Sequence, residues 1–197
     1  MSLTDNKALK KSLPQNGTLQ PSLGKPVKDN GVLSISASYT DMGGANIKSL
    51  TGRTTMLLRN NKVVFSGKEK MKGFTTINFN GLNYMIVPVT EGWFTLDNLD
   101  LSGIGSAMII AGWQKAPQYG FDFEIRLDDV AGKLLGAGNI TAGKEKSNQG
   151  GLGFGMTSLT IEPVTDGKFH TIYIISKPKD SKESSQIALQ SIQFNLK

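Results

Sequence analysis

The chain has few of the side chains that enzymes use for covalent or acid–base chemistry. Among its 197 residues there is one histidine, His170, and no cysteine. Without cysteine, thiolate catalysis, disulfides, iron–sulfur clusters and cysteine-bound zinc are excluded. His170 could still serve a Ser–His–Asp triad, but it lies in the strand-like pattern Phe169–Ile175, where a histidine is more often packed or hydrogen-bonded. We therefore expect a protein that is not an enzyme and carries no cofactor.

Acidic side chains offer a weaker route to catalysis. A hydrolase would place two carboxylates across a cleft, and the candidates are Asp122, Glu124 and Asp128. Asp122 and Glu124 alternate on one face of a strand pattern, but nothing in the sequence puts them beside a cleft. The acidic segment Asp97–Gly103 lacks the spacing and the distal glutamate of a calcium loop, so we interpret it as a strand end followed by a turn.

Two glycine-rich segments resemble nucleotide-binding loops. Gly138–Lys144 matches G-x-x-x-x-G-K, but Glu145 stands where a Ser or Thr should bind the metal, and no helix pattern follows. Gly150–Gly155 does not fit the dinucleotide fingerprint and precedes a strand pattern rather than a helix. Both segments are predicted to be ordinary turns or loops.

Aromatic side chains are better candidates for ligand binding, because aromatic faces pack on the C–H groups of sugars while amide and acid groups bind the hydroxyls. Trp93 heads an alternating strand pattern, so we expect it to be buried. Trp113 and Tyr119 flank the loop Gln114–Gln118, which is a better place for an exposed platform. The aromatic candidates are Tyr84, Trp93, Trp113, Tyr119 and Phe154.

The chain is basic, with a formal net charge of +6, and one segment concentrates this charge. Arg53–Lys72 holds six basic residues and one acidic residue. Such a strip can bind nucleic acid or another anionic polymer, but no aromatic series interleaves with it and no nucleic-acid motif is present. We expect an edge strand protected by lysines and no nucleic-acid partner.

The sequence predicts that short β-strands hold the candidate side chains named above. From residue 31 onward, apolar stretches alternate with Gly, Asn and Asp clusters, and no window keeps a helical period beyond about two turns. This pattern predicts an all-β sandwich or jelly roll over residues 31–197. The expected strands are Val32–Tyr39, Thr54–Leu58, Lys62–Phe65, Thr75–Phe79, Tyr84–Val87, Trp93–Leu96, Ser106–Gly112, Phe121–Leu127, Lys133–Ile140, Gly155–Ile161, His170–Ser176 and Ile187–Asn195.

Residues 1–30 are different in character. They are polar, contain three prolines and show no sustained period, which predicts an extended linker or arm in front of the sandwich. Met1–Lys11 has no apolar core of a secretory signal, although Met1-Ser2-Leu3 is equally compatible with a start introduced by cloning. Apolar runs such as Ala107–Trp113 fall far short of the ~20 residues of a membrane helix, so no membrane insertion is expected.

Several segments together resemble the family 6 carbohydrate-binding modules, which are jelly-roll β-sandwiches appended to secreted bacterial enzymes. The resemblance covers residues 31–197 and rests on the segments Val32–Tyr39, Gly92–Gly103, Phe123–Asp128 with Gly132–Gly136, Pro163–Tyr173 and Leu189–Phe194. More narrowly, the chain is similar to the C-terminal module behind cytochrome c and quinoprotein-type sugar dehydrogenase domains. The resemblance implies an attached catalytic or cytochrome c domain and a periplasmic or extracellular location.

The resemblance also implies a site, with departures. The tryptophan that follows a Gly-Gly pair in the family is replaced here by Leu152, and the sugar-binding asparagine falls on Ala188. The family's calcium positions fall on Ser38 and Gln190, which are not anionic, so we expect no metal site. We therefore expect non-catalytic binding of a polysaccharide or glycan through Trp113, Tyr119, Tyr84, Phe154, Gln186, Asn148 and Gln149. The alternative is a docking domain that has lost the sugar site and contacts a partner domain or an anionic surface through Arg53–Lys72.

Overall fold

The protein is an all-β sandwich. The structure, a computed structural model, describes residues 32–141 and 152–197, and within these ranges it contains thirteen strands and no helix. Every expected strand coincides with a strand, and only the two-residue β4 was not predicted. The strands are β1 Val32–Thr40, β2 Thr51–Arg59, β3 Lys62–Val63, β4 Met71–Lys72, β5 Thr75–Phe79, β6 Leu82–Ile86, β7 Gly92–Asp100, β8 Ile104–Trp113, β9 Gly120–Leu127, β10 Leu134–Thr141, β11 Gly153–Thr160, β12 Phe169–Pro178 and β13 Ile187–Leu196.

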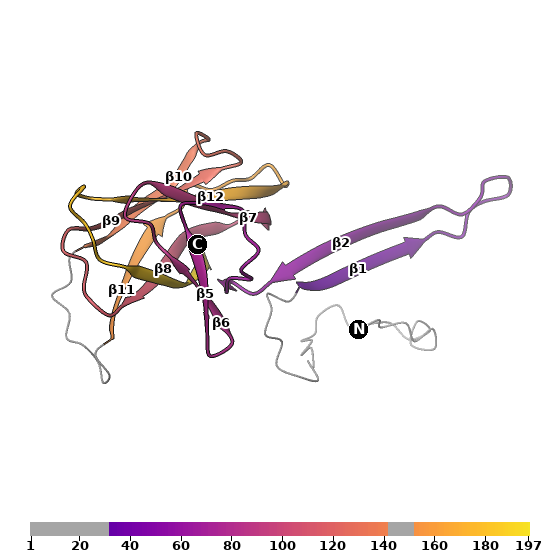
Figure 1. The fold of residues 1–197 in the computed structure, drawn as a ribbon. Helices are drawn as coiled ribbons and strands as arrows, with labels where there is room; N and C mark the ends of the chain where they lie inside the picture. The colour runs from indigo at the N-terminus through magenta and orange to yellow at the C-terminus, as the bar shows by residue number, and fades with distance from the viewer. Residues whose placement is uncertain (1–31, 142–151) are drawn as a thin grey trace.

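Two antiparallel sheets face each other in the body of the molecule (Figure 1). The smaller sheet has the order β10-β9-β12-β7-β4, and the larger sheet has the order β11-β8-β13-β6-β5, with β3 paired to β13. The residue alternation along β9 explains how such a sheet forms: Phe121, Phe123 and Ile125 are fully buried, while Asp122 and Glu124 point outward. The predicted all-β sandwich is confirmed, whereas the arm predicted over residues 1–30 lies outside the described residues.

Aromatic rings fill the core near the start of β7. Phe94 is fully buried and meets Phe65 and Phe74 edge-to-face, at centroid distances of 5.6 and 5.1 Å. Such pairs stabilise a core by roughly 0.5–1.5 kcal/mol each beyond their buried area. Neither Phe65 nor Phe74 lies in a strand, so these contacts fix two loops to the sandwich.

β1 and β2 form a hairpin that joins neither sheet. Val32 pairs with Arg59 at its base and Thr40 with Thr51 near its tip. Asp41 closes the connecting loop, since its Oδ1 accepts hydrogen bonds from the backbone N–H groups of Gly43 and Leu50 at 3.0 and 2.8 Å. Val32–Tyr39 was expected to be the first strand of the sandwich; it is a strand, but it pairs only with β2. We call residues 32–59 the projecting hairpin, because Figure 1 shows them extending away from the body.

The strand register defines two ends of the body. Trp113, Gly153 and Ile187 lie side by side across β8, β11 and β13. The loop after Trp113 and the loop before Ile187 therefore lie at one end, which we call the loop end. The projecting hairpin leaves from the other end, which we call the hairpin end (Figure 1). Within the described ranges, no helix has the length and apolar character that crossing a membrane requires.

Candidate functional site

Trp113 is a core residue and not an exposed platform. Its exposed fraction is only 5%, and its indole lies where side chains of Gly153 and Gly155 on the neighbouring strand would otherwise stand. The alternation of β8 continues to its last residue and turns Trp113 inward, and the two glycines make room for the ring. The prediction that Trp113 offers an exposed face to a sugar is therefore wrong.

Trp93 shows the opposite deviation. It is only partly buried, because its neighbour Phe94 takes the inward position on β7 and turns Trp93 outward on the smaller sheet. Its ring lies 5.3 Å from that of Tyr173, with 58° between the planes. The expectation that Trp93 is buried is wrong, since the inward series on this strand begins one residue later.

Phe154 and Tyr84 both lie on the outer face of the larger sheet. Phe154 stands between the inward-facing Gly153 and Gly155, and 46% of it is exposed. Its ring covers Gly112 on the adjacent strand, because a Cβ on that glycine would come within 3.1 Å of the ring. Tyr84 is partly buried and precedes the fully buried Met85, so it also points outward.

Small and apolar residues connect these two rings. Phe154 pairs with Gly112, Gly112 with Ala188, and Ala188 with Ile86, which lies two residues from Tyr84 on β6. This row crosses three strand spacings, about 14 Å. The small side chain of Ala188 leaves the row low between Gly112, which the Phe154 ring covers, and Ile86.

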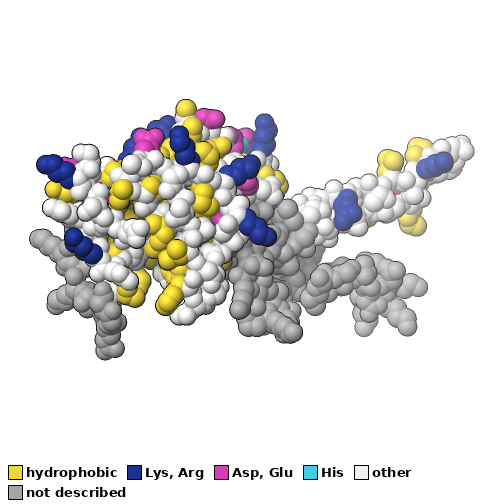
Figure 2. Space-filling view, viewed as in Figure 1, with side chains coloured by type: hydrophobic (Ala, Val, Ile, Leu, Met, Phe, Trp, Pro, Cys, Tyr) yellow, Lys and Arg dark blue, Asp and Glu magenta, His cyan; other side chains and the backbone are white. Residues whose placement is uncertain are grey.

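The outer face of the larger sheet is rich in apolar side chains. Figure 2 shows hydrophobic side chains running across this side of the body toward the β5–β6 hairpin. The outward apolar residues are Ile77, Phe79, Leu82, Tyr84, Ile86, Met108, Ile110, Phe154 and Met156. So many outward apolar side chains on one face are typical of a binding surface rather than of an ordinary solvated sheet.

The polar candidates lie at the loop end. Gln186 is exposed directly before β13, two residues from Ala188 in the row described above. Tyr119 is partly buried in the β8–β9 loop, and its hydroxyl accepts a hydrogen bond from the Gln118 side chain at 3.3 Å. Asn148 and Gln149 lie outside the described residues. The structure thus brings Phe154 and Gln186 to one end of the outer face, with Tyr84 farther along it.

Glu183 holds the two loops of this end together. Its buried carboxylate accepts backbone N–H groups from Tyr119 and Gly120 at 2.7 and 3.0 Å, and from Ser184 and Ser185 at 3.0 and 2.9 Å. Burial alone would raise the pKa of Glu183, but these hydrogen bonds outweigh it and lower the pKa to about 2. A carboxylate engaged in this way is a structural clamp and not a proton donor.

His170 is a structural residue, as the sequence predicted. It is buried, and its Nδ1 and Nε2 lie 2.8 and 3.0 Å from the carboxylates of Asp128 and Asp166. The hydrogen bond to Asp166, then that to Asp128, raises the pKa of His170 above its usual value, while burial opposes this. Asp128 also accepts the backbone N–H of Thr171, so the cluster joins the loops after β9 and before β12.

The basic segment Arg53–Lys72 does not form one strip. Arg53 belongs to the projecting hairpin, whereas Lys62 and Lys72 lie on the edge strands β3 and β4 of the two sheets. Lys70 lies 3.9 Å from Asp97. β4 carries a single exposed lysine, Lys72, so the expected protection of an edge strand by lysines is reduced there to one residue. A docking surface made of the whole segment is not favoured.

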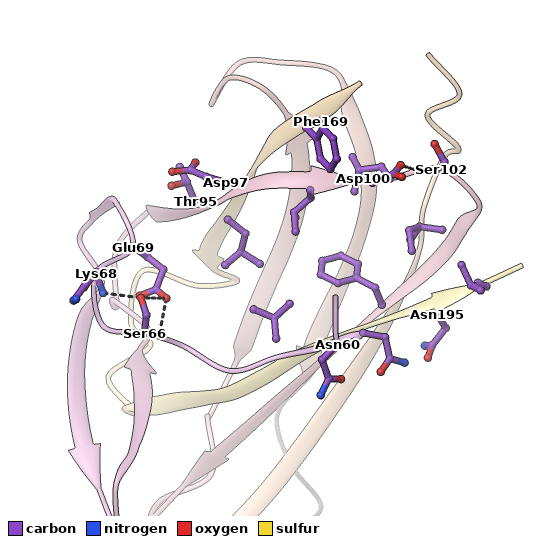
Figure 3. Close-up of a pocket in the computed structure, with 18 residues that line it drawn as sticks. Asn60, Ser66, Lys68, Glu69, Thr95, Asp97, Asp100, Ser102, Phe169 and Asn195 are labelled. Atoms are coloured by element: carbon purple, nitrogen blue, oxygen red, sulfur yellow. Dashed lines mark hydrogen bonds between the residues drawn. The ribbon is translucent and has the colours of Figure 1, made fainter. Parts of the chain in front are cut away.

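A groove of about 950 Å³ lies at the hairpin end, and sequence reasoning missed it (Figure 3). Its apolar lining includes the core residues Leu96, Leu101 and Phe194. Polar side chains surround them, including three carboxylates and one lysine: Glu69, Asp97, Asp100 and Lys68. The segment Asp97–Gly103 contributes here as the predicted strand end and turn, with Asn98 and Gly103 at positive φ.

Comparison with known proteins identifies the fold. No protein-family model matches the chain, and no curated protein matches it in sequence. A family 6 carbohydrate-binding module from Clostridium cellulolyticum, solved with xylose, superposes with a TM-score of 0.54 at 17% identity, over 69% of this chain and 97% of that one. A β-1,3-glucan-binding family 6 module from Bacillus halodurans gives 0.53 at 13% identity, over 69% and 96%.

A third similar structure is much larger than this chain. It is a family 43 arabinoxylan arabinofuranohydrolase from Bacillus subtilis, solved with cellotetraose, with a TM-score of 0.50 at 17% identity. The match covers 72% of this chain but only 29% of the enzyme. The chain therefore has the β-sandwich fold of the family 6 carbohydrate-binding modules.

Proposed function

We propose that this chain is a non-catalytic glycan-binding module that binds a polysaccharide across the outer face of the larger sheet. The observation that carries the proposal is the pair Phe154 and Tyr84, two outward rings on one face that are joined by the row Gly112, Ala188 and Ile86. Aromatic faces in this position stack on the apolar faces of sugar rings. The fold it shares with modules solved with xylose or described as glucan-binding supports the same role.

Gln186 and Tyr119 complete the proposed site at the loop end. The exposed Gln186 amide both donates and accepts hydrogen bonds, so it can bind a hydroxyl of a sugar stacked on Phe154. Tyr119 provides a hydroxyl on the adjacent loop, and the Glu183 clamp holds that loop in place. Trp113 supports the site from beneath, because Gly153 and Gly155, which flank Phe154, pack on its indole.

We further propose that the module tethers an attached exported enzyme to its polysaccharide. The arabinofuranohydrolase structure, of which the match covers 29%, is an example of this fold within a larger enzyme. Tethering would raise the concentration of substrate near the catalytic domain without new contacts in the active site. A cytochrome c or sugar dehydrogenase domain as the attached partner, and a periplasmic or extracellular location, rest on the sequence resemblance.

Affinity electrophoresis against xylan, β-1,3-glucan and soluble cellulose derivatives tests this proposal. Phe154→Ala should abolish the retardation that the wild-type chain shows in one of these polymers. Phe169→Ala is the matched control, because Phe169 is 49% exposed against 46% for Phe154 but lies at the hairpin end. Equal loss of retardation in both variants would contradict the proposed site. No retardation of the wild-type chain by any of these polymers would contradict the proposed function.

A further inference from the structure

β5, the outermost strand of the larger sheet, has a free edge. It pairs with β6 on one side, and no strand within the described ranges pairs with it on the other. All five of its residues, Thr75–Phe79, are exposed. The two-residue turn Asn80-Gly81, with φ values of 51° and 77°, links it to β6. The N–H and C=O groups along such an edge are a template for another strand.

The turn determines which backbone groups face this edge. In a two-residue hairpin the residues that flank the turn, here Phe79 and Leu82, form a hydrogen-bonded pair, and hydrogen-bonded and non-hydrogen-bonded pairs then alternate. Ile77 therefore bonds to β6, whereas Thr76 and Asn78 direct their N–H and C=O groups to the open side. In the part of the chain that the structure describes, the backbone groups of Thr76 and Asn78 have no hydrogen-bond partner on this side.

This edge lacks the features that protect the other edges of the two sheets. β4 is only two residues long and carries the exposed Lys72. β10 and β11 close one side of the sandwich against each other, since a Cβ on Gly136 would overlap the Thr160 carbonyl. β5 has neither a charged residue nor a proline, and residues 73–90 contain no charged side chain. An exposed, uncharged edge strand is prone to pair with another chain.

The edge is apolar and is held in a fixed position. Ile77 and Phe79, which lie on its outer face, are 48% and 60% exposed. The Asn83 side chain on β6 accepts a hydrogen bond from the Asn78 amide at 2.9 Å and donates one to the Phe65 carbonyl at 3.1 Å. These bonds connect both strands of the β5–β6 hairpin to the body, so an incoming strand meets an edge that is already in the extended conformation.

The sequence of β5 matches antiparallel pairing with a second copy of itself. A two-fold axis at Ile77 places Thr76 opposite Asn78 of the second copy, and the open N–H and C=O groups of these residues then form hydrogen-bonded pairs. Ile77 lies opposite Ile77 of the second copy, and Thr75 lies opposite Phe79. Cross-strand pairs of β-branched and aromatic side chains stabilise a sheet, and no like charges are brought together.

We propose that two copies of this chain pair through β5 and form a closed two-fold dimer in which the two larger sheets become one continuous sheet. The assembly stops at two copies, because each β5 edge is occupied by the other. Both outer faces then lie on the same side, and the two Tyr84 rings are three strand spacings apart, about 14 Å, since Tyr84 pairs with Ile77. A long polysaccharide would cross from one copy to the other; this consequence rests on the proposed function, whereas the dimer does not.

Disulfide formation tests the register, and the chain has no native cysteine that would interfere. In Ile77→Cys the two thiols lie directly opposite each other at the spacing that a disulfide requires, so mild oxidation should give a covalent dimer. Phe79→Cys is the matched control, because it is exposed on the same strand and face, but its two copies lie about 14 Å apart in this register. Equal yields from both variants, or no covalent dimer from Ile77→Cys, would contradict the pairing.

Sedimentation equilibrium of the full chain, without polysaccharide, measures the dimer directly. We expect a concentration-dependent dimer whose dissociation constant rises at least tenfold in Thr76→Pro, because proline removes an edge N–H that the fold itself does not use. Ile77→Lys should have a similar effect, since it places two like charges opposite each other. Val89→Lys is the control, because Val89 is also exposed in the uncharged segment 73–90 but lies in the β6–β7 loop.

Three sedimentation results would overturn the proposal: a monomer at all concentrations, association that continues beyond two copies, or equal weakening by Val89→Lys and Ile77→Lys. Far-ultraviolet circular dichroism checks that each variant keeps its strands, so that loss of the dimer is not mistaken for loss of the fold. Since no polysaccharide is present, these results are separate from the glycan test. A dimer that no polysaccharide retards would contradict the proposed function and leave the β5 pairing in place.

Discussion

The carboxylate of Glu183 accepts the backbone N–H of Tyr119 at 2.7 Å, and so joins two loops that are distant in sequence. The same carboxylate also binds Gly120, Ser184 and Ser185. Because these four N–H groups have one acceptor residue, the conformation of the loop end depends on a single side chain.

Glu183→Gln should destabilise the fold. The amide replaces one carboxylate oxygen by a donor, which leaves buried N–H groups without an acceptor at a cost of about 1–3 kcal/mol. Urea unfolding monitored by tryptophan fluorescence measures the change. Glu162→Gln is the control, because Glu162 is exposed and forms a surface ion pair with Lys133. A loss as large in Glu162→Gln would contradict the assignment.

The contribution of Glu183 should also depend on pH. Its pKa is about 2 in the folded chain against 4.5 for the unperturbed group, so the ionised form is the one that folding stabilises. The contribution is complete above pH 4.5 and is lost as the pH falls toward 2. The stability difference between wild type and Glu183→Gln should therefore shrink over this interval, and a constant difference would argue against the clamp.

His170 should give the opposite dependence. Its hydrogen bonds to Asp166 and Asp128 raise its pKa above 6.5, so folding stabilises the protonated ring. This contribution is complete below pH 6.5 and is lost as the pH rises through the folded value. Thermal unfolding of wild type and His170→Gln between pH 5.5 and 9 should show a difference that narrows with rising pH; a difference that widens would refute this assignment.

Gly155→Ala should destabilise the sandwich through Trp113. The added Cβ would overlap the indole, and a shift of this buried ring costs about 1–3 kcal/mol. Gly52→Ala is the matched control, because its added Cβ meets no atom within 4 Å. Chemical unfolding and near-ultraviolet circular dichroism of the tryptophan environment distinguish the two variants. An unchanged Trp113 environment in Gly155→Ala would contradict this packing.

The length of the ligand should decide how much Tyr84 contributes to glycan binding. If a single oligosaccharide spans the row from Phe154 to Tyr84, Tyr84→Ala should weaken binding of a long oligosaccharide but not of a monosaccharide. Phe154→Ala should weaken binding of both. Calorimetric titration with an oligosaccharide series measures this. Stacking should change little between low and high salt, in contrast to charge-driven contact. Equal effects of Tyr84→Ala at all lengths would contradict a spanning ligand.

The fold was predictable because the strands follow simple rules. Phe121, Phe123 and Ile125 alternate with charged residues, and alternation of this kind is visible in a single sequence. The inward direction of Trp113 was not predictable, because the space for its ring comes from Gly153 and Gly155 on another strand. The register that brings β11 beside β8 is a long-range property that a single sequence does not show.

The candidate site was only partly predictable. Phe154 and Tyr84 were named from their types and Gln186 from the family resemblance, but their position on one face depends on the order β11-β8-β13-β6. The groove was not foreseen, because the segments that line it are distant in the sequence. The projecting hairpin was assigned to the sandwich because Val32–Tyr39 has the sequence pattern of a strand. That pattern does not show with which other strand the segment pairs.

Among the residues that the structure describes, no strand lies beyond either end of the low row between Phe154 and Tyr84. It crosses β8 and β13, and it terminates at the edge strand β11 on one side and near the edge strand β5 on the other. A polymer lying along this row would cross both edges of the described sheet without meeting a further strand. Such a surface would select the interior of a long chain rather than a reducing or non-reducing terminus, and many copies could occupy one molecule of polymer at once.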